Sequence, residues 1–403
     1  MRIAVINWTN RLAGGVETYL RQAIPALRSR GHHIALVHET EAPEDRQCFV
    51  TPGADPVWSI VRSGVDQTLA NLAAWDPEIL YVHGLRDHEW LTDAVRSTPT
   101  VFFCHDYTGI CITGTKTFRI LSNAYACDRR LGWQCLLRFY PGHCGGWNPA
   151  TMLRDYRRQS DRLEFMRLGY ALVTASTAVR EQFLKNGFVP EDVHLAPLMP
   201  AVDAPAHSSA IRAEPPWRLL FAGRMEWLKG GDVMLEAVSI ASARLKQPIH
   251  LTLYGDGRKR QQWESQAERL QTNDLRIDFA GWQDSEAVQA ALGQTHLLIM
   301  PSVWPEPFGL SGIEAGLHGV PVAAFRRGGI PDWLEDGVNG FMAPADPPRP
   351  EELADAIVKC LRDPDTLERL RSGATKLAQR FTIHRHLQCL EAIFTATPAQ
   401  KVA

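Results

Sequence analysis

Short apolar runs alternate with helical patterns through the first half of the chain. Apolar runs that predict buried strands lie at 3–6, 34–37, 79–82, 101–103 and 170–174. The pattern after the first run predicts a helix over 16–30, and Ser176 stands where it would cap a later helix. Strands separated by helices are typical of a parallel sheet covered on both faces, which indicates an α/β fold.

The same alternation starts again after a stretch rich in Pro and Ala, 197–216, which we interpret as a linker. Further elements are predicted as strands at 218–222, 249–254, 276–279 and 296–300 and a helix at 230–245. A chain of 403 residues is too long for a single hydrophobic core. We therefore expect two Rossmann-like domains, each with a ligand-binding edge at the carboxyl ends of its strands.

Composition narrows the choice of function and of cellular compartment. The net charge of −2 argues against a general nucleic-acid binder, so no nucleic-acid partner is expected. No run of eighteen apolar residues predicts a membrane span. The first residues read as a buried strand rather than a signal peptide. Eight cysteines without such a signal then favour a reducing cytoplasm.

Two carboxylates mark the most informative segment of the sequence. Glu306 and Glu314 have seven residues between them, and the run 307–312 suits a loop that enters a helix. The helical pattern starts at Ile313, which puts Glu314 in the first turn. Free N–H groups at a helix N-terminus favour a phosphate, while carboxylates suit hydroxyls. A nucleotide sugar presents both groups, although an ordinary exposed glutamate near a helix start is the simpler alternative.

The residues around this pair resemble the retaining glycosyltransferases of family 4, the glycosyltransferase group 1 type with the GT-B fold. The resemblance is carried by Glu-Pro-Phe-Gly-Leu at 306–310, the second Glu, Gly-Val-Pro-Val at 319–322 and Gly-Gly-Ile-Pro at 328–331. It covers nearly the whole chain and is loosest between about 110 and 170. It implies two Rossmann-like domains that face each other across a cleft. Residues 1–200 would receive the acceptor and 215–382 the donor, with a helix at about 383–403 returning to the first domain.

A basic loop follows the strand predicted at 218–222. Gly223-Arg224 and Lys229-Gly230 combine a planar guanidinium fork and a point charge with glycines, which suits a diphosphate. A solvated basic turn is the simpler alternative for such a motif. The resemblance implies that Arg224 and Lys229 stabilise the leaving diphosphate and that Gly223 approaches the donor.

Two further motifs lie at the carboxyl ends of predicted strands in the first half. Gly14 and Gly15 follow the first strand and open a helix, which suits backbone approach to a phosphate or acceptor. His105 follows the strand at 101–103 and is placed to face the other domain, although an ordinary structural histidine is the alternative; His83 is a weaker candidate. The resemblance implies that His105 holds the donor sugar.

By the same resemblance, Glu306 would contact the sugar hydroxyls and Glu314 the ribose hydroxyls. The donor-binding backbone between them would run through Phe308, Gly309 and Leu310. We find no Asp-x-Asp motif in a suitable loop, so no metal is expected for catalysis and no cofactor is required beyond the donor itself.

The segment 104–144 departs from the family pattern. It holds five cysteines, of which Cys111, Cys127, Cys135 and Cys144 are a candidate structural metal site; plain thiols and disulfides are the alternatives, since no Cys-x2–4-Cys knuckle is present. From Lys116 to Arg167 there are ten Lys or Arg against four Asp or Glu. Three of these arginines, Arg154, Arg158 and Arg162, recur every four residues, which predicts one helical face. That face is either solvated or a surface for anionic lipid or a pyrophosphate-linked acceptor.

The sequence therefore predicts a retaining hexosyltransferase that uses a nucleoside-diphosphate sugar, with UDP or GDP as the nucleotide. The acceptor would be a glycan or a lipid-linked glycan, in surface polysaccharide or glycolipid assembly. We expect a cytoplasmic enzyme with peripheral contact to the inner face of an anionic membrane. The alternatives are a GT-B nucleotide-sugar epimerase and a non-catalytic nucleotide-sugar-binding subunit.

Overall fold

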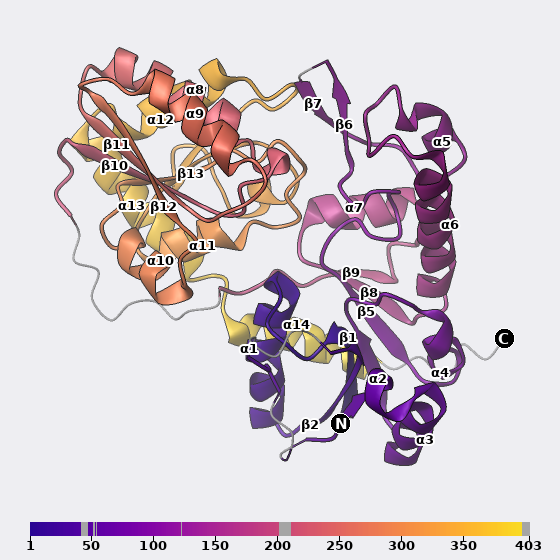
Figure 1. Cartoon of the computed structure of the whole chain (residues 1–403). Coiled ribbons are helices and arrows are strands. Elements are labelled where there is room, and N and C mark those ends of the chain that lie inside the picture. Colours follow the sequence, from indigo (N-terminus) through magenta and orange to yellow (C-terminus); the bar gives the residue numbers. More distant parts are fainter. Residues whose placement is uncertain (42–46, 51–52, 54, 122, 201–210, 397–403) are drawn as a thin grey trace.

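Two parallel sheets organise the protein, as its computed structural model shows (Figure 1). The structure describes residues 1–41, 47–50, 53, 55–121, 123–200 and 211–396. The first sheet has the strand order β3-β2-β1-β4-β5-β8-β9 and the second the order β12-β11-β10-β13-β14-β15. In each sheet the chain starts at a central strand, β1 or β10, and adds the next two strands on one side. It then crosses back to the other side of the central strand and adds the remaining strands there, which is the doubly wound Rossmann arrangement. The predicted α/β fold with two Rossmann-like halves is confirmed.

The first half contains the strands and helices that precede the predicted linker. Its sheet strands are β1 (Arg2–Thr9), β2 (His33–Thr40), β3 (Val57–Ser59), β4 (Ile79–Val82), β5 (Thr100–Cys104), β8 (Ala171–Thr174) and β9 (Val193–Leu195). Its helices are α1 (Gly15–Ser29), α2 (Ile60–Ser63), α3 (Val65–Trp75), α4 (Thr92–Ser97), α5 (Gln134–Phe139), α6 (Pro149–Met166) and α7 (Thr177–Lys185), with a 3-10 turn, η1, at Glu89–Leu91. A separate antiparallel hairpin consists of β6 (Thr117–Ile120) and β7 (Asn123–Ala126).

The second half repeats the alternation. Its strands are β10 (Trp217–Ala222), β11 (Ile249–Tyr254), β12 (Leu275–Gly281), β13 (Leu297–Met300), β14 (Val322–Phe325) and β15 (Gly340–Ala343). Its helices are α8 (Gly231–Leu245), α9 (Arg260–Leu270), α10 (Ser285–Leu292), α11 (Leu310–Leu317), α12 (Pro350–Leu361), α13 (Pro364–Ala378) and α14 (Ile383–Thr395), with 3-10 turns η2 at Trp227–Lys229 and η3 at Ile330–Asp332.

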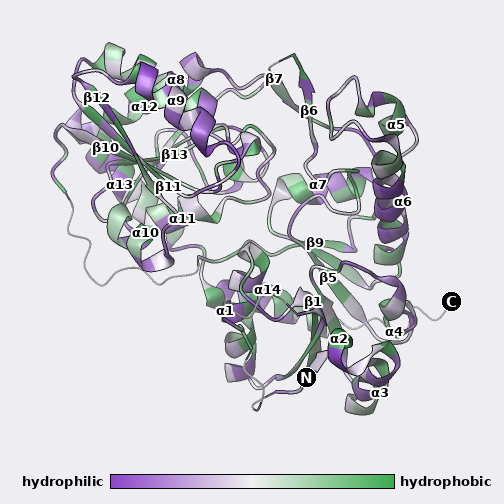
Figure 2. Ribbon diagram, in the orientation of Figure 1, coloured by the Kyte–Doolittle hydropathy of each residue, from purple (hydrophilic) through white to green (hydrophobic). Residues whose placement is uncertain are grey.

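The strands are apolar along their length because helices cover both faces of each sheet. Every residue of β4, β5, β8, β13 and β14 is buried. Figure 2 shows mainly hydrophobic strands inside and hydrophilic residues on the outer helices. Among the described helices, none combines the length and apolar character needed to cross a bilayer.

Helix α14 packs on α1, beside the first sheet, although it follows the second half in sequence (Figure 1). Leu390 and Phe394 of α14 are fully buried there. The helix predicted from about 383 therefore lies against the first half, and residues 397–403 fall outside the described residues. Half of the predicted linker, 201–210, also falls outside them. The domain boundaries at 200 and 215, and the acceptor and donor roles of the halves, stay predictions.

Candidate functional site

The candidate site residues gather where the strand order of each sheet reverses. In the first sheet this point lies between β1 and β4, and in the second between β10 and β13. Gly14 and Gly15 follow β1, and His83 follows β4. Lys229 follows β10, and the loop that contains Glu306 follows β13. Ligands of doubly wound sheets bind in the crevice at this reversal, so both sheets direct their loops toward a common region.

Glu306 is the most heavily coordinated polar side chain of the site. Lys229 Nζ donates to both carboxylate oxygens, at 3.0 and 2.9 Å. Ser302 Oγ and Trp304 Nε1 donate to Oε2 at 2.8 and 2.9 Å. Only 8% of Glu306 is exposed. The carboxylate is thus a fixed, fully hydrogen-bonded group rather than a solvated surface charge.

The surroundings of Glu306 keep it ionised. Burial alone would raise the pKa of its carboxyl group, but the charge of Lys229 and the hydrogen bonds from Lys229, Ser302 and Trp304 outweigh burial and leave the pKa below its ordinary value. A buried carboxylate of this kind carries a full negative charge at neutral pH. It can accept hydrogen bonds from sugar hydroxyls if Lys229 turns toward another anion.

A glycine sets the position of Lys229. Gly230, which follows η2, has φ +64°, and a Cβ there would lie 2.1 Å from the carbonyl oxygen of Pro301. Only glycine permits this approach, which brings the end of η2 against the loop after β13. Val303 N donates to Leu228 O at 2.9 Å and joins the two loops. The ion pair of Lys229 and Glu306 follows from this contact.

Two more glycines hold the backbone of Glu306 from the other side. Gly329 N donates to Glu306 O at 2.7 Å. A Cβ on Gly328 would lie 2.1 Å from the same oxygen, and one on Gly329 would lie 2.6 Å from Ser176 Cβ of the first half. The Gly-Gly of 328–329 therefore lies between the backbone of Glu306 and Ser176 of the first half.

Helix α11 begins three residues earlier than the sequence predicts. It starts at Leu310 after Gly309, whose φ is +91°, so Glu314 lies in the second turn rather than the first. The prediction was wrong because the glycines at 309 and 312 were taken as loop residues. Glu314 is half-buried on this helix. The N-terminus of α11, where the first N–H groups lack intrahelical acceptors, follows directly after the loop that carries Glu306.

Phe308 contributes to packing as well as to the approach to α11. Its side chain is 2% exposed and contacts Phe381 with ring centroids 5.8 Å apart. Its carbonyl oxygen accepts a hydrogen bond from Trp333 Nε1 at 2.6 Å. A ligand would therefore meet the backbone of 308–310 rather than the Phe308 ring, while Leu310 is half-buried at the core edge.

The remaining donor candidates are open to solvent or to a ligand. Arg224 is exposed in the loop after β10, next to Gly223. Gly14 caps α1, and a Cβ on Gly15 would meet no atom within 4 Å. The chain itself therefore does not require glycine at position 15, and the open space is available to a bound molecule.

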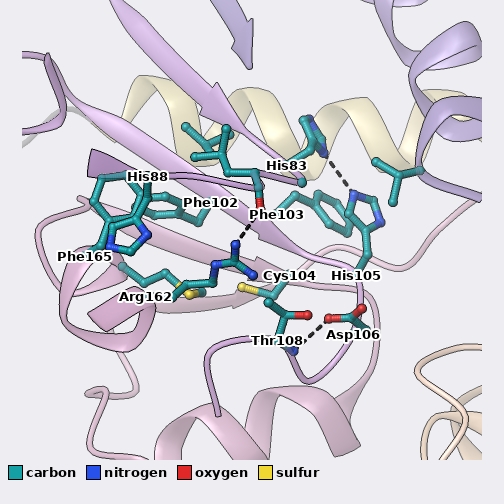
Figure 3. A pocket seen from close by; sticks show the side chains of 15 residues that line it. His83, His88, Phe102, Phe103, Cys104, His105, Asp106, Thr108, Arg162 and Phe165 are labelled. Atoms are coloured by element: carbon teal, nitrogen blue, oxygen red, sulfur yellow. Dashed lines mark hydrogen bonds between the residues drawn. The ribbon is translucent and has the colours of Figure 1, made fainter. Parts of the chain in front are cut away.

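His105 lies beside a second histidine in the first half (Figure 3). His83 Nδ1 and His105 Nε2 are 2.9 Å apart, and the His105 ring stacks on Phe103 with centroids 4.4 Å apart. Burial, with the nearby His386, lowers the pKa of His105 to about 3. Both rings are neutral at neutral pH, because burial and the two neighbouring histidines also hold the pKa of His83 well below its ordinary value. His83 Nε2 is buried without a partner among the described residues.

A hydrogen-bonded chain behind these histidines was not predicted. His386 Nδ1 lies 2.9 Å from Pro197 O, and its Nε2 lies 2.9 Å from Tyr19 Oη. Burial lowers the pKa of His386 to about 4, so the ring is neutral and its one proton sits on Nδ1 toward the carbonyl. Tyr19 Oη then donates to Nε2 and accepts from Tyr81 Oη at 2.7 Å. Isolated Tyr and His residues in three distant elements form no motif, so sequence carried no signal of this chain.

A cavity of about 170 Å³ opens beside His105 at the ends of β4 and β5. Figure 3 shows Phe102, Phe165 and Arg162 on one side of the cavity and His105 and Asp106 on the other. Arg162 of α6 donates to Leu85 O. The cavity can therefore take an apolar group of a ligand, with polar atoms near its mouth.

The arginine spacing predicted a helix, and α6 carries Arg154, Arg158 and Arg162 four residues apart along one face. Arg158 and Arg162 of α6 both donate to backbone carbonyls of 85–86 in the first half. Burial lowers the pKa of Arg162, whereas Arg154, beside Asp155, and Arg158 are exposed. The nearby loop offers carbonyl acceptors that a helical pattern alone does not reveal.

Tyr107 connects the first half to the loop of Glu306. Its ring meets that of Trp304 edge-on with centroids 6.5 Å apart, and the side chain is 1% exposed. Its hydroxyl is buried without a hydrogen-bond partner among the described residues. Burial, and then Glu306, raise the pKa of this hydroxyl, so it stays protonated. Tyr107 is a site residue that sequence reasoning missed.

The four candidate metal cysteines do not form a metal centre in the described part of the chain. No group of three or more His, Cys, Asp or Glu side chains there is placed to hold a metal ion. All eight cysteines are free thiols, so the disulfide alternative is not realised either. Burial raises the pKa of Cys135, and that of Cys144 to about 12, which keeps both thiols protonated. Cys135 and Cys144 therefore act as small packing residues around α5, and Cys111 packs against the core of the first half.

Two family models match the chain, one in each half. The model described as Glycosyltransferase Family 4 matches residues 13–198, and the one described as Glycosyl transferases group 1 matches 205–377. A D-inositol 3-phosphate glycosyltransferase from Streptomyces bingchenggensis is 34% identical over 199 residues, which are 47% of this chain and 43% of the relative. A Mycobacterium tuberculosis glycogen synthase is 25% identical over 94% of this chain and 91% of the relative.

Solved structures share the fold at low identity. Anabaena HepE in complex with UDP and glucose superposes with a TM-score of 0.66 at 20% identity, over 98% of this chain and 100% of that one. The lipopolysaccharide outer core galactosyltransferase WaaB gives 0.67 at 13% identity, over 98% and 99%. For the Streptomyces relative the match spans less than half of either chain. The two family models, which together reach from residue 13 to 377, and the paired Rossmann-like halves place this chain in the group 1, family 4 glycosyltransferases of the GT-B fold.

Proposed function

We propose that the protein is a retaining glycosyltransferase that moves a hexosyl group from a nucleoside-diphosphate sugar to an acceptor hydroxyl. The observation that carries this proposal is the ion pair of the half-buried Lys229 with the buried Glu306. It joins a cation suited to a diphosphate with a carboxylate suited to sugar hydroxyls, close to the start of α11. The neutral His105 and the 170 Å³ cavity in the first half complete the proposed site.

The donor is assigned mainly to the second half. The diphosphate would lie at the N-terminus of α11, with Lys229 and the exposed Arg224 as its counter-charges. Glu314, one turn into α11, would accept hydrogen bonds from the ribose. UDP is the first nucleotide to test, because HepE of the same fold is described in complex with UDP and glucose.

The transfer follows from where charge develops. The bond between the anomeric carbon and the diphosphate oxygen breaks, and negative charge grows on the departing phosphate, where Arg224, Lys229 and the helix N-terminus stabilise it. The acceptor oxygen bonds to the anomeric carbon on the face that the diphosphate leaves. Its proton passes to the departing phosphate oxygen. Because the new bond forms on the same face as the broken one, the sugar keeps its anomeric configuration. His105, neutral because burial lowers its pKa, would hold a sugar hydroxyl without adding charge.

The acceptor is assigned to the first half, around the cavity beside His105. A glycan or a lipid-linked glycan of surface polysaccharide or glycolipid assembly fits a site with an apolar pocket and polar groups at its mouth. Tyr107, whose buried hydroxyl lacks a partner among the described residues, would hydrogen-bond the sugar or the attacking hydroxyl between the halves.

Calorimetry with UDP, GDP and ADP sugars tests the donor. Binding of one nucleotide sugar, lost in Glu314→Gln, is the expected result. Transfer is then tested by NMR of the product formed from that donor and a panel of glycan acceptors, with an unchanged anomeric configuration expected. Inverted product would overturn the retaining mechanism. Isomerised sugar without acceptor would indicate an epimerase, and binding without turnover a non-catalytic subunit.

A further inference from the structure

Large apolar side chains are exposed in one part of the first half. The described chain exposes thirteen such side chains, and six of them fall within 120–153. The most exposed are Leu121 at 88%, Trp147 at 71%, Leu137 at 67% and Trp133 at 64%, with Ile120 and Leu153 beside them. Single exposed apolar residues need no explanation, but this concentration, with two tryptophans, does.

Four of these residues lie on α5, on α6 or in the segments that flank α5, and the other two lie on the β6–β7 hairpin. Ile120 and Leu121 lie at the turn of the β6–β7 hairpin. Trp133 directly precedes α5 and Leu137 follows four residues later, so both point from one face of that helix. Leu153 is in the first turns of α6, and Figure 1 places α5 and α6 together at the outer edge of the first half. In Figure 2 α5 carries hydrophobic residues despite this outer position.

Hydrogen bonds and a small apolar core connect the segments that carry these exposed side chains. Arg119 N of the hairpin donates to Gly142 O at 2.7 Å, and Cys144 N donates to Phe139 O at 3.0 Å. Phe139 is buried in a small core with Ile112 and Met152. The exposed Trp147 ring stacks on Tyr140 with centroids 5.7 Å apart and planes 9° apart. The apolar side chains are therefore displayed by an ordered support.

Exposed arginines surround the apolar side chains. They are Arg130, Arg138, Arg154 and Arg157. The whole segment 116–167 carries ten Lys or Arg and four Asp or Glu. Arg158 is exposed too, and although it and Arg162 donate to carbonyls of 85–86, these bonds leave both guanidinium charges in place.

We propose that this surface, hereafter the 120–153 surface, docks on an anionic lipid bilayer. Tryptophan prefers the interface between headgroups and acyl chains, leucine inserts below it, and arginines beside them attract anionic headgroups. The apolar side chains stand on separate protrusions with arginines between them. A fluid bilayer accommodates such relief, whereas a protein partner would need a matching surface. The proposal stands independently of the proposed transfer reaction.

Flotation with vesicles tests the proposal directly. Full-length protein is mixed with phosphatidylcholine vesicles that contain one-third phosphatidylglycerol, or none. We expect flotation with the anionic vesicles only, and weaker flotation at high salt, because the Debye length falls to about 3 Å at 1 M. The triple variant Trp133→Ser, Leu137→Ser, Trp147→Ser should lose at least about tenfold in partitioning, as should Arg130→Ser with Arg138→Ser.

Trp282→Ser is the matched control. Trp282 is 73% exposed in the second half, between β12 and α10, and its loss should leave flotation unchanged. Melting temperatures of all variants verify that these exposed positions do not unfold the chain. Absence of flotation with anionic vesicles, or equal loss in the Trp282 variant, would overturn the proposal. A dimer in light scattering that the triple variant dissolves, without any vesicle binding, would instead assign the surface to a second copy of the chain.

Discussion

Lys229 holds both carboxylate oxygens of Glu306, although 77 positions separate the two residues in the sequence. In the ligand-free protein the cation proposed for the diphosphate and the carboxylate proposed for the sugar neutralise each other. When a nucleotide sugar binds, Lys229 would contact its diphosphate and Glu306 would contact its sugar, so the two side chains would no longer pair with each other. The half-buried Lys229 therefore compensates the buried charge of Glu306 until the donor provides other partners.

Lys229→Met should destabilise the protein by about 3 kcal/mol, because it leaves the Glu306 carboxylate buried without its counter-charge. The double variant Lys229→Met, Glu306→Gln removes both charges and should recover most of that loss. Urea unfolding of the three proteins measures both effects. Equal stability of the single and double variants would show that the pair contributes no coupling.

Acid should weaken the fold through Glu306. Its folded pKa lies below the ordinary value, so its contribution is present above about pH 4.5 and is lost as the pH falls through the folded pKa. Unfolding free energies between pH 7 and pH 3 should therefore decline less steeply in Glu306→Gln than in the wild type below pH 4.5. Parallel curves would argue against an ionised, stabilising Glu306.

His386 should act in a different pH window. Its pKa falls from 6.5 to about 4 on folding, so the unfolded chain binds the proton first as the pH drops below 6.5. Stability should fall between pH 6.5 and pH 4, by up to about 3 kcal/mol. His386→Gln should flatten this part of the curve, whereas His33→Gln, at an exposed histidine, should not. The same slope in all three proteins would contradict the assignment.

Two glycine substitutions test different roles. Gly230→Ala tests whether glycine is needed for stability, and Gly15→Ala tests whether a ligand occupies the open space beside it. A Cβ at Gly230 meets Pro301 O at 2.1 Å and requires a left-handed backbone, so the variant should lose at least about 3 kcal/mol. A Cβ at Gly15 meets no atom within 4 Å, so that variant should melt normally. If a ligand occupies this space, Gly15→Ala should still lower turnover in steady-state assays. Normal turnover would move the ligand away from the start of α1.

Arg224→Ala should lower kcat by about a hundredfold while donor affinity changes little, because the negative charge grows as the diphosphate departs. Arg269→Ala, at an exposed arginine of α9, is the control and should keep wild-type kcat. Steady-state kinetics with the donor identified by calorimetry measure both. Loss of affinity at constant kcat would assign Arg224 to ground-state binding only.

The strands at the two reversal points were predictable because their residues are apolar on both faces. The run 79–82 matches β4 at both ends, and the runs 218–222 and 296–300 differ from β10 and β13 by one residue at their starts. The start of α11 was misjudged because Gly309 and Gly312 are helix breakers in isolation, yet the first caps the helix and the second packs on Trp333. Local pattern thus identifies elements better than their ends.

The contacts between distant residues were not predictable from one sequence. The spacing of Arg158 and Arg162 indicated a helix but not the carbonyls that lie opposite. The hydroxyl of Tyr107 and the Tyr19–His386 bond depend on how the halves and α14 meet. Only the folded chain brings these groups together.

The hydrogen bond from His386 to Pro197 joins the two places where the chain passes between its halves, before β10 and before α14. A single connection would allow one half to rotate about any axis relative to the other. Because two connections lie side by side, we expect the halves to rotate mainly about one axis, which opens and closes the space between them. We expect cleavage of the chain before α14 to remove this restriction. The final helix would thus limit how the halves approach each other, although it lies behind the site.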